Sequence, residues 1–169
     1  SRIGKGTGKN APRFVRAAQE AAKEASKAAP VWVMPEYKIP EQLPPQLGEF
    51  DLVILDEASQ SDITALAALA RGKKLLIVGD EEQVSPSNVG IPSERINAIR
   101  AEHLHGLPNS KLIDENTSIF EITMRMYPTS HLVLREHFRC VAPIIQFSTR
   151  FYSNRLIPLR VPKASERFD

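Results

Sequence analysis

The stretch FDLVILDEASQ, residues 50–60, decides how this sequence is interpreted. Its apolar run Leu52–Leu55 is typical of a parallel strand that is buried on both faces. Asp56 and Glu57 follow where such a strand should leave the sheet. Because buried carboxylates are unstable without a positive partner, the pair predicts a cation at the end of this strand.

A second apolar run, KKLLIVGD at residues 73–80, also ends in a carboxylate. The segment between the two runs predicts a helix, with Ser61 or Asp62 as its N-cap and Gly72 at its C-terminal stop. Strands that alternate with helices predict an α/β fold with a parallel sheet flanked by helices. In such sheets ligands bind outside the carboxyl ends of the strands, where Asp56 and Asp80 fall.

Weaker patterns predict the remaining elements. Strands are expected at 31–34, where Trp32 should be buried in the sheet rather than free to stack on bases, and at 131–134. Helices are expected at 11–29, 93–105, 119–126 behind a capping box of Ser118 and Glu121, and 142–152.

Composition favours one globular domain, since 42% of the 169 residues are hydrophobic and 25% are charged. The net charge is only +2, but residues 1–30 carry seven Lys/Arg against two Glu, and residues 150–169 carry five against two acids. Basic ends suit contact with phosphate or with other protein, and solvated surface charge explains either end equally well.

Several classes of protein are disfavoured by the sequence. Cys140 is the one cysteine, which excludes an intramolecular disulfide framework and gives no zinc-ligand spacing. No apolar run approaches the roughly 20 residues of a membrane span, and the start is not a signal peptide. We therefore expect no membrane partner and a soluble protein inside the cell, cytoplasmic or, in a eukaryote, nuclear.

Paired carboxylates at a strand end suit nucleoside-triphosphate hydrolysis. In that chemistry one Asp holds Mg²⁺, usually through water, and a neighbouring acid polarises the attacking water. The alternative interpretation is structural, with Asp56 and Glu57 only capping the helix that follows.

Three ordered motifs resemble those of superfamily 1 helicases, in the branch of the nonsense-mediated-decay helicase and the senataxin-like enzymes. The family pattern D-E-A-x-Q is matched at 56–60, and G-D-x-x-Q-L-x-P is matched at 79–86 with Val84 in the Leu position. The pattern L-x-x-Q-Y-R-M-x-P is matched in kind by Leu134, Arg139 and Pro143, and the family's F-S…F-Y…L follows in Phe147, Ser148, Phe151, Tyr152 and Leu156. The resemblance covers about residues 50–157.

This resemblance implies a role for each matched residue. Asp56 would coordinate Mg²⁺ and contribute to nucleotide binding, and Glu57 would be the catalytic base. Gln60 and Gln83 would lie near the γ-phosphate of ATP, with Gln83 coupling the nucleotide state to nucleic-acid contacts. Arg139 would stabilise charge on the transferring phosphoryl group, for which a planar guanidinium is chemically suited.

Other positions carry smaller expectations. Gly79 and Asp80 belong to the implied phosphate-sensing motif and would contribute to nucleotide binding. We expect Asp80 to orient the backbone of that motif rather than to bind metal. The structural alternative for Arg139 is a surface salt bridge to Glu136. His137 stands where the family has Gln, and both a nucleotide contact and a structural role are open for it.

The glycine-rich opening GKGTGKN, residues 4–10, is not expected to be a P-loop. Asn10 follows Lys9 where the phosphate-binding pattern needs Ser or Thr, and too few residues precede the loop for a strand. The resemblance thus implies an incomplete RecA-like P-loop NTPase fold that lacks the P-loop strand. We expect a basic loop, helix and proline-rich link at 1–49, the motifs at 50–157, and a linker at 158–169 toward a second motor domain.

The expected function is that of a fragment of an ATP-dependent helicase or translocase that acts on single-stranded DNA or RNA, with ATP and Mg²⁺ as cofactors. Its implied partners include the missing P-loop segment and the second RecA-like domain of the parent chain. Without a P-loop the isolated fragment should hydrolyse little ATP. The alternative is a non-catalytic nucleic-acid-binding or assembly module with a degenerate RecA-like fold.

Overall fold

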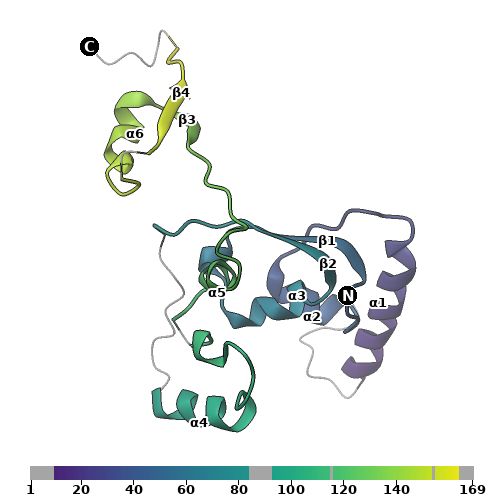
Figure 1. Cartoon of the computed structure of the whole chain (residues 1–169). Helices are drawn as coiled ribbons and strands as arrows, with labels where there is room; N and C mark the ends of the chain where they lie inside the picture. Colours follow the sequence, from purple (N-terminus) through teal and green to yellow (C-terminus); the bar gives the residue numbers. More distant parts are fainter. Residues whose placement is uncertain (1–9, 84–92, 115, 154, 164–169) are drawn as a thin grey trace.

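The computed structural model describes residues 10–83, 93–114, 116–153 and 155–163. The glycine-rich opening up to Lys9, and Val84 and Pro86 of the third-motif pattern, lie outside these residues. Figure 1 shows the helices α1 (Ala11–Ser26), α2 (Ile39–Gln42), α3 (Leu66–Leu69), α4 (Ser93–His103), α5 (Ile119–Met126) and α6 (Ala142–Thr149), and the strands β1 (Phe50–Leu55), β2 (Gly72–Ile77), β3 (Glu136–Val141) and β4 (Ile157–Arg160).

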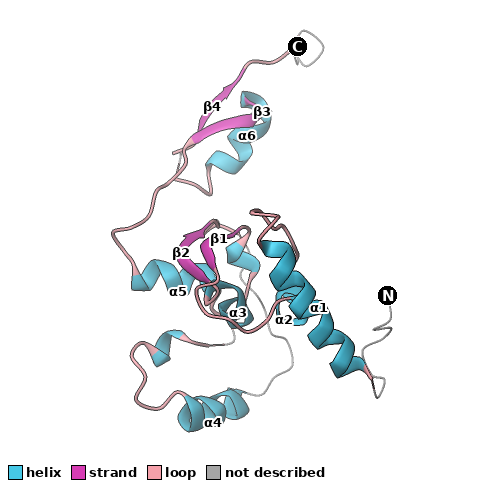
Figure 2. Cartoon of the chain, turned by 90° about the vertical axis from the view of Figure 1, so that its right-hand side faces the viewer, coloured by secondary structure: helices cyan, strands magenta, loops and turns pink. Residues whose placement is uncertain are grey.

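The chain is mixed α/β, with two small parallel sheets among its described residues. β1 and β2 form the first sheet, in a register that pairs Phe50 with Gly72 and Leu55 with Ile77. α3 connects these strands and packs against both of them (Figures 1 and 2). The core of this part consists of buried apolar residues from β1, the segment 58–69 and α5: Leu55, Ala58, Ala65, Leu69, Ile119 and Ile122.

The prediction that β1 and β2 are buried on both faces is wrong for the described chain. Val53, Leu55 and Ile77 face the core, and side chains alternate along a strand, so Leu52, Ile54 and Leu76 face the other way. Their exposed fractions are 49%, 59% and 49%. The second face is open because no described element packs on it, whereas the sequence pattern assumed a layer on each side.

The second sheet pairs β3 with β4, also in parallel, with a register irregularity between His137 and Val141. Together with α6 it forms what we call the C-terminal unit (β3, α6 and β4). Both Figure 1 and Figure 2 show this unit standing apart from the first sheet at the end of an extended segment. Among the described residues the predicted parallel sheet is thus found as two separate two-stranded sheets, and both are parallel as predicted.

Two predicted strands are absent from the structure. Residues 131–134 lack regular structure, with Leu132 and Leu134 94% and 87% exposed, and the strand lies instead at 136–141. Residues 31–34 also lack it, because no neighbouring strand pairs with them; Trp32 is half-buried outside any sheet and donates its Nε1–H to the carbonyl of Ala29 at 2.7 Å.

The predicted helices fare better. α1 ends at Ser26, three residues before the predicted end, and α6 ends at Thr149 rather than at residue 152. The helix expected at 61–72 is a 3₁₀ turn followed by the short α3; Asp62 caps it by accepting from the Thr64 amide at 2.8 Å, and Gly72 already belongs to β2. The capping box of Ser118 and Glu121 is confirmed at the start of α5.

Among the helices described, none has the length and apolar character that crossing a membrane requires.

Candidate functional site at the carboxyl edge of the first sheet

The parallel register brings the ends of β1 and β2 together. The Val78 amide donates to the Leu55 carbonyl at 2.8 Å, and the Ala58 amide donates to the Val78 carbonyl at 2.8 Å. These bonds extend the pairing beyond the strands, so that the segments 56–60 and 78–83 lie side by side. The two acid-bearing strand ends of the sequence therefore form one cluster, as expected for the carboxyl edge of a parallel sheet.

Asp56 and Glu57 are both exposed at this edge. The Glu57 amide donates to Asp56 Oδ1 at 3.0 Å, and Glu57 itself has left-handed backbone angles of φ 55 and ψ 35. The prediction that a cation is needed to offset burial of this pair is wrong, because water already reaches both carboxylates. A role in metal or water chemistry must then rest on the position and ligand type of these side chains.

Ser59 and Gly79 join the two segments tightly. Ser59 is buried, and its Oγ accepts from the Asp80 amide at 2.5 Å. A Cβ built on Gly79 would lie 2.5 Å from Cδ2 of Phe120 on α5. Only a residue without a side chain fits between Ser59 and α5, so Gly79 has a packing role in this structure.

A chain of side-chain hydrogen bonds links the two motifs. Gln60 Nε2 donates to Gln83 Oε1 at 3.3 Å, and Gln83 Nε2 donates to Asp80 Oδ2 at 3.2 Å. Asp80 Oδ1 accepts from the Glu82 amide at 3.1 Å. Asp80 thus makes the contacts expected of a residue that orients its own loop, and the two glutamines are in direct contact.

Arg139 does not lie in this cluster. It is an exposed residue inside β3, not beyond a strand end, because the strand begins later than predicted. Its carbonyl accepts from Arg160 Nη1 at 2.8 Å. Among the described residues its guanidinium forms no salt bridge to Glu136, so the structural alternative for Arg139 has no support here.

His137 has a structural contact. Its Nε2 accepts from the amide of Cys140 at 2.9 Å, across the irregular part of β3. That nitrogen is occupied by the backbone, which favours the structural interpretation of His137 over a nucleotide contact.

Tyr152 is a site residue to which sequence reasoning gave no role. It follows α6, and its phenol donates to Asp80 Oδ2 at 2.5 Å across 72 positions of sequence. The hydrogen bond to Asp80, with burial and the charge of Asp80 behind it, raises the pKa of Tyr152 to about 12. The family pattern marks this tyrosine, but no local spacing rule connects it to residue 80.

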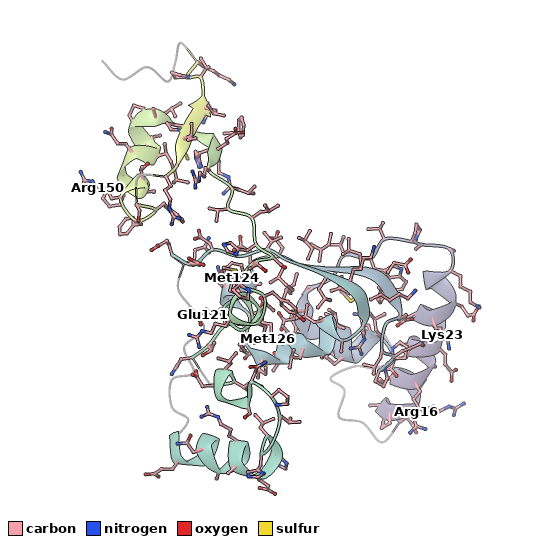
Figure 3. The ribbon with its side chains drawn as sticks, viewed as in Figure 1. Arg16, Lys23, Glu121, Met124, Met126 and Arg150 are labelled. Atoms are coloured by element: carbon pink, nitrogen blue, oxygen red, sulfur yellow. The ribbon has the colours of Figure 1, made fainter. Side chains whose placement is uncertain are left out.

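A cavity of ≈ 280 Å³ opens beside the cluster. Ser59, Asp80 and Glu81 form one side, and α5 forms the other with Phe120, Glu121, Met124 and Arg125. Figure 3 shows Glu121 and Met124 on this helix. Neither Asp56, Glu57 nor Arg139 lines the cavity, so it adjoins the predicted catalytic residues without containing them.

The residues present fit a magnesium ion better than a metal that needs a protein cage. Within the described ranges no group of three or more His, Cys, Asp or Glu side chains converges on one point. Mg²⁺ usually keeps several waters and takes only one or two carboxylates, with phosphate oxygens as further ligands. The exposed Asp56 carboxylate is suited to that mode of binding.

These features define an α/β protein with an acid and amide cluster at the carboxyl edge of a parallel strand pair. No protein-family model matches the sequence. Over 110 residues, or 64% of its length, the chain is 28% identical to a curated protein of Methanocaldococcus jannaschii named as an uncharacterized ATP-dependent helicase. The matched part is 14% of that relative, so the chain spans about a seventh of its length.

Proposed function

We propose that this chain is a segment of the first RecA-like motor domain of an ATP-dependent helicase or translocase, in the superfamily 1 branch that its motifs resemble. The observation that carries the proposal is the contact of the segments 56–60 and 78–83 at one sheet edge, where Gln60 bonds to Gln83. A parallel strand pair with an α-helical connection is compatible with a RecA-like fragment. The distant similarity to an archaeal helicase supports the same class.

In this proposal Glu57 is the general base. Its exposed carboxylate lies two residues after the buried Leu55, on a backbone turn fixed by the Ala58–Val78 hydrogen bond. A carboxylate held on a rigid strand end can orient a water and accept its proton. Asp56 would hold Mg²⁺, which when bound neutralises charge on the phosphate oxygens of ATP.

The remaining residues act on the phosphates. Gln60 and Gln83 form a pair of side-chain amides that can respond to the presence or loss of the γ-phosphate. Each amide has hydrogen-bond donors and an acceptor, so it can exchange a bond to its partner for a bond to phosphate. Arg139 would supply positive charge to the transferring group, once the C-terminal unit is placed against the nucleotide. The P-loop segment and the second motor domain of the parent protein would complete the site.

The proposed substrate besides ATP is single-stranded DNA or RNA. The basic character of residues 1–30 and 150–169 suits the phosphate backbone, which dominates nucleic-acid affinity. Figure 3 shows two of these basic residues, Arg16 on α1 and Arg150 beyond α6. Neither end distinguishes DNA from RNA.

The test is ATP hydrolysis by the full-length protein, with and without single-stranded DNA and RNA, beside Glu57→Gln. We expect stimulation by one of the two strands, and a loss of turnover of about 10²-fold or more in Glu57→Gln with ATP binding retained. Glu94→Gln is the matched control, because Glu94 is an exposed acid on α4.

The opposite result favours the alternative function. If neither nucleic acid stimulates turnover and Glu57→Gln behaves as wild type, the acids at 56 and 57 are structural. The chain would then be a non-catalytic nucleic-acid-binding or assembly module.

A further inference from the structure

The contact between Tyr152 and Asp80 joins the first sheet to the C-terminal unit, two parts of the chain that belong to separate sheets. Asp80 lies in the loop after β2, whereas Tyr152 follows α6 in the C-terminal unit that also carries Arg139. The phenol donates to a carboxylate at 2.5 Å, a short distance typical of a hydrogen bond to a charged acceptor. Such bonds are stronger than those between neutral groups, so this contact can fix one part relative to the other.

Asp80 is held by three donors. Oδ2 accepts from Tyr152 and from Gln83 Nε2, and Oδ1 accepts from the Glu82 amide. The carboxylate therefore has little freedom to rotate while all three bonds are made. Loss of the Tyr152 donor frees one side of Oδ2 to water and loosens the group that orients Gln83.

The orientation of Gln83 then determines that of Gln60. Because the Gln83 amide nitrogen is committed to Asp80, its oxygen is the atom that faces Gln60 Nε2. A side-chain amide has one donor end and one acceptor end, so fixing one end fixes the other. The hydrogen-bond chain thus runs from Tyr152 through Asp80 and Gln83 to Gln60.

Tyr152 is itself well positioned to act on this chain. Its carbonyl accepts from the Arg155 amide at 3.0 Å, closing the turn that follows α6. Just before it, the rings of Phe147 and Phe151 pack edge to face with centroids 5.8 Å apart. A shift of the C-terminal unit would therefore carry the phenol with it.

We propose that Tyr152 is a positioning residue, which links the placement of the Arg139-bearing C-terminal unit to the orientation of Gln83 and Gln60 at the sheet edge. The proposal rests on the proposed function for its effect on catalysis. Tyr152 touches neither ATP nor metal in this scheme; it acts through Asp80. Its phenol is protonated at neutral pH, as that of any tyrosine is, and can therefore act as a donor there.

The test uses the full-length protein with Tyr152→Phe, which keeps the ring and removes the donor. We expect kcat to fall between about 10- and 100-fold, as for a misplaced catalytic group, with KM for ATP changed less than about twofold. Asp80→Asn should lower kcat as well, and the double variant should be no worse than the poorer single variant. Tyr127→Phe is the control, because it removes the hydroxyl of an exposed tyrosine.

A second readout does not depend on activity. Hydrogen–deuterium exchange of peptides that cover 79–83 should rise in Tyr152→Phe and stay unchanged in Tyr127→Phe. If the wild-type protein hydrolyses ATP but Tyr152→Phe leaves kcat intact, or if its effect adds fully to that of Asp80→Asn, the positioning role is overturned. If wild type lacks ATPase activity, the proposed function fails; a rise in exchange at 79–83 still supports the link, and unchanged exchange overturns it too.

Discussion

Glu57, the proposed catalytic base, has an unfavourable backbone conformation. It is one of three non-glycine residues with positive φ among those described, at φ 55. Left-handed angles cost an L-residue about 1–2 kcal/mol, and such residues persist where the surrounding structure holds them. Here the bonds of Ala58 to Val78 and of Glu57 to Asp56 hold the turn. Glycine would adopt these angles without that cost, so the presence of Glu57 here favours a role for its carboxylate.

Comparison of Glu57→Gly with Glu57→Ala tests whether the backbone at residue 57 is strained. Both variants remove the carboxylate, but only glycine relieves the left-handed strain, so Glu57→Gly should be more stable than Glu57→Ala by about 1 kcal/mol. Both should lose ATPase activity equally. Urea unfolding of the two proteins measures the difference, and equal midpoints would show that the turn is unstrained.

At the scale of elements, the sequence predicted those helices and strands whose positions depend on neighbouring residues in the chain. β1 ends one residue and β2 three residues before the predicted ends, and the capping box of α5 lies where it was predicted, since apolar runs and cap chemistry are short-range signals. β3 was missed because HLVL is the more apolar segment, whereas pairing with β4 selects the polar EHFRCV instead. The Tyr152–Asp80 contact spans 72 positions, and no pattern within a window of the sequence predicts it.

Gly79→Ala tests how the loop after β2 packs on α5. The new Cβ would lie 2.5 Å from Phe120 Cδ2 and 2.7 Å from Ser59 Oγ, so the loop or the ring must move. We expect a loss of about 1–3 kcal/mol in the free energy of unfolding, as for other overpacked sites. Adding Phe120→Leu should recover part of that loss in a thermal melt; a double variant less stable than either single one would contradict this packing.

At the scale of the whole molecule, the titratable contact of Tyr152 with Asp80 connects the loop after β2 to the C-terminal unit. The pKa of Tyr152 is raised from 10.0 to about 12, so the bond to Asp80 stabilises the fold below the unfolded-state value and is lost as pH rises from 10 toward 12. This half-buried bond should contribute about 1 kcal/mol.

The stability difference between wild type and Tyr152→Phe should therefore be constant between about pH 7 and 9 and shrink above about pH 10. Denaturant unfolding of the full-length protein at each pH measures it. Because the two proteins share every other titrating group, common alkaline effects cancel. A difference that persists unchanged above pH 11 would show that the stability difference does not come from the hydrogen bond of the protonated phenol to Asp80.

The open face of the first sheet has a consequence for handling the protein. Leu52, Ile54 and Leu76 form an uncovered patch on a sheet that has only two strands among the described residues, so its outer edges offer unpaired backbone groups as well. Two copies of the chain can therefore associate through these exposed apolar side chains or by pairing of their edge strands. When the 169-residue chain is expressed by itself, we expect aggregation of the folded protein, rather than thermal unfolding, to limit the yield of soluble protein. The substitution Ile54→Lys should then raise the fraction of soluble protein in the supernatant without altering the acid cluster.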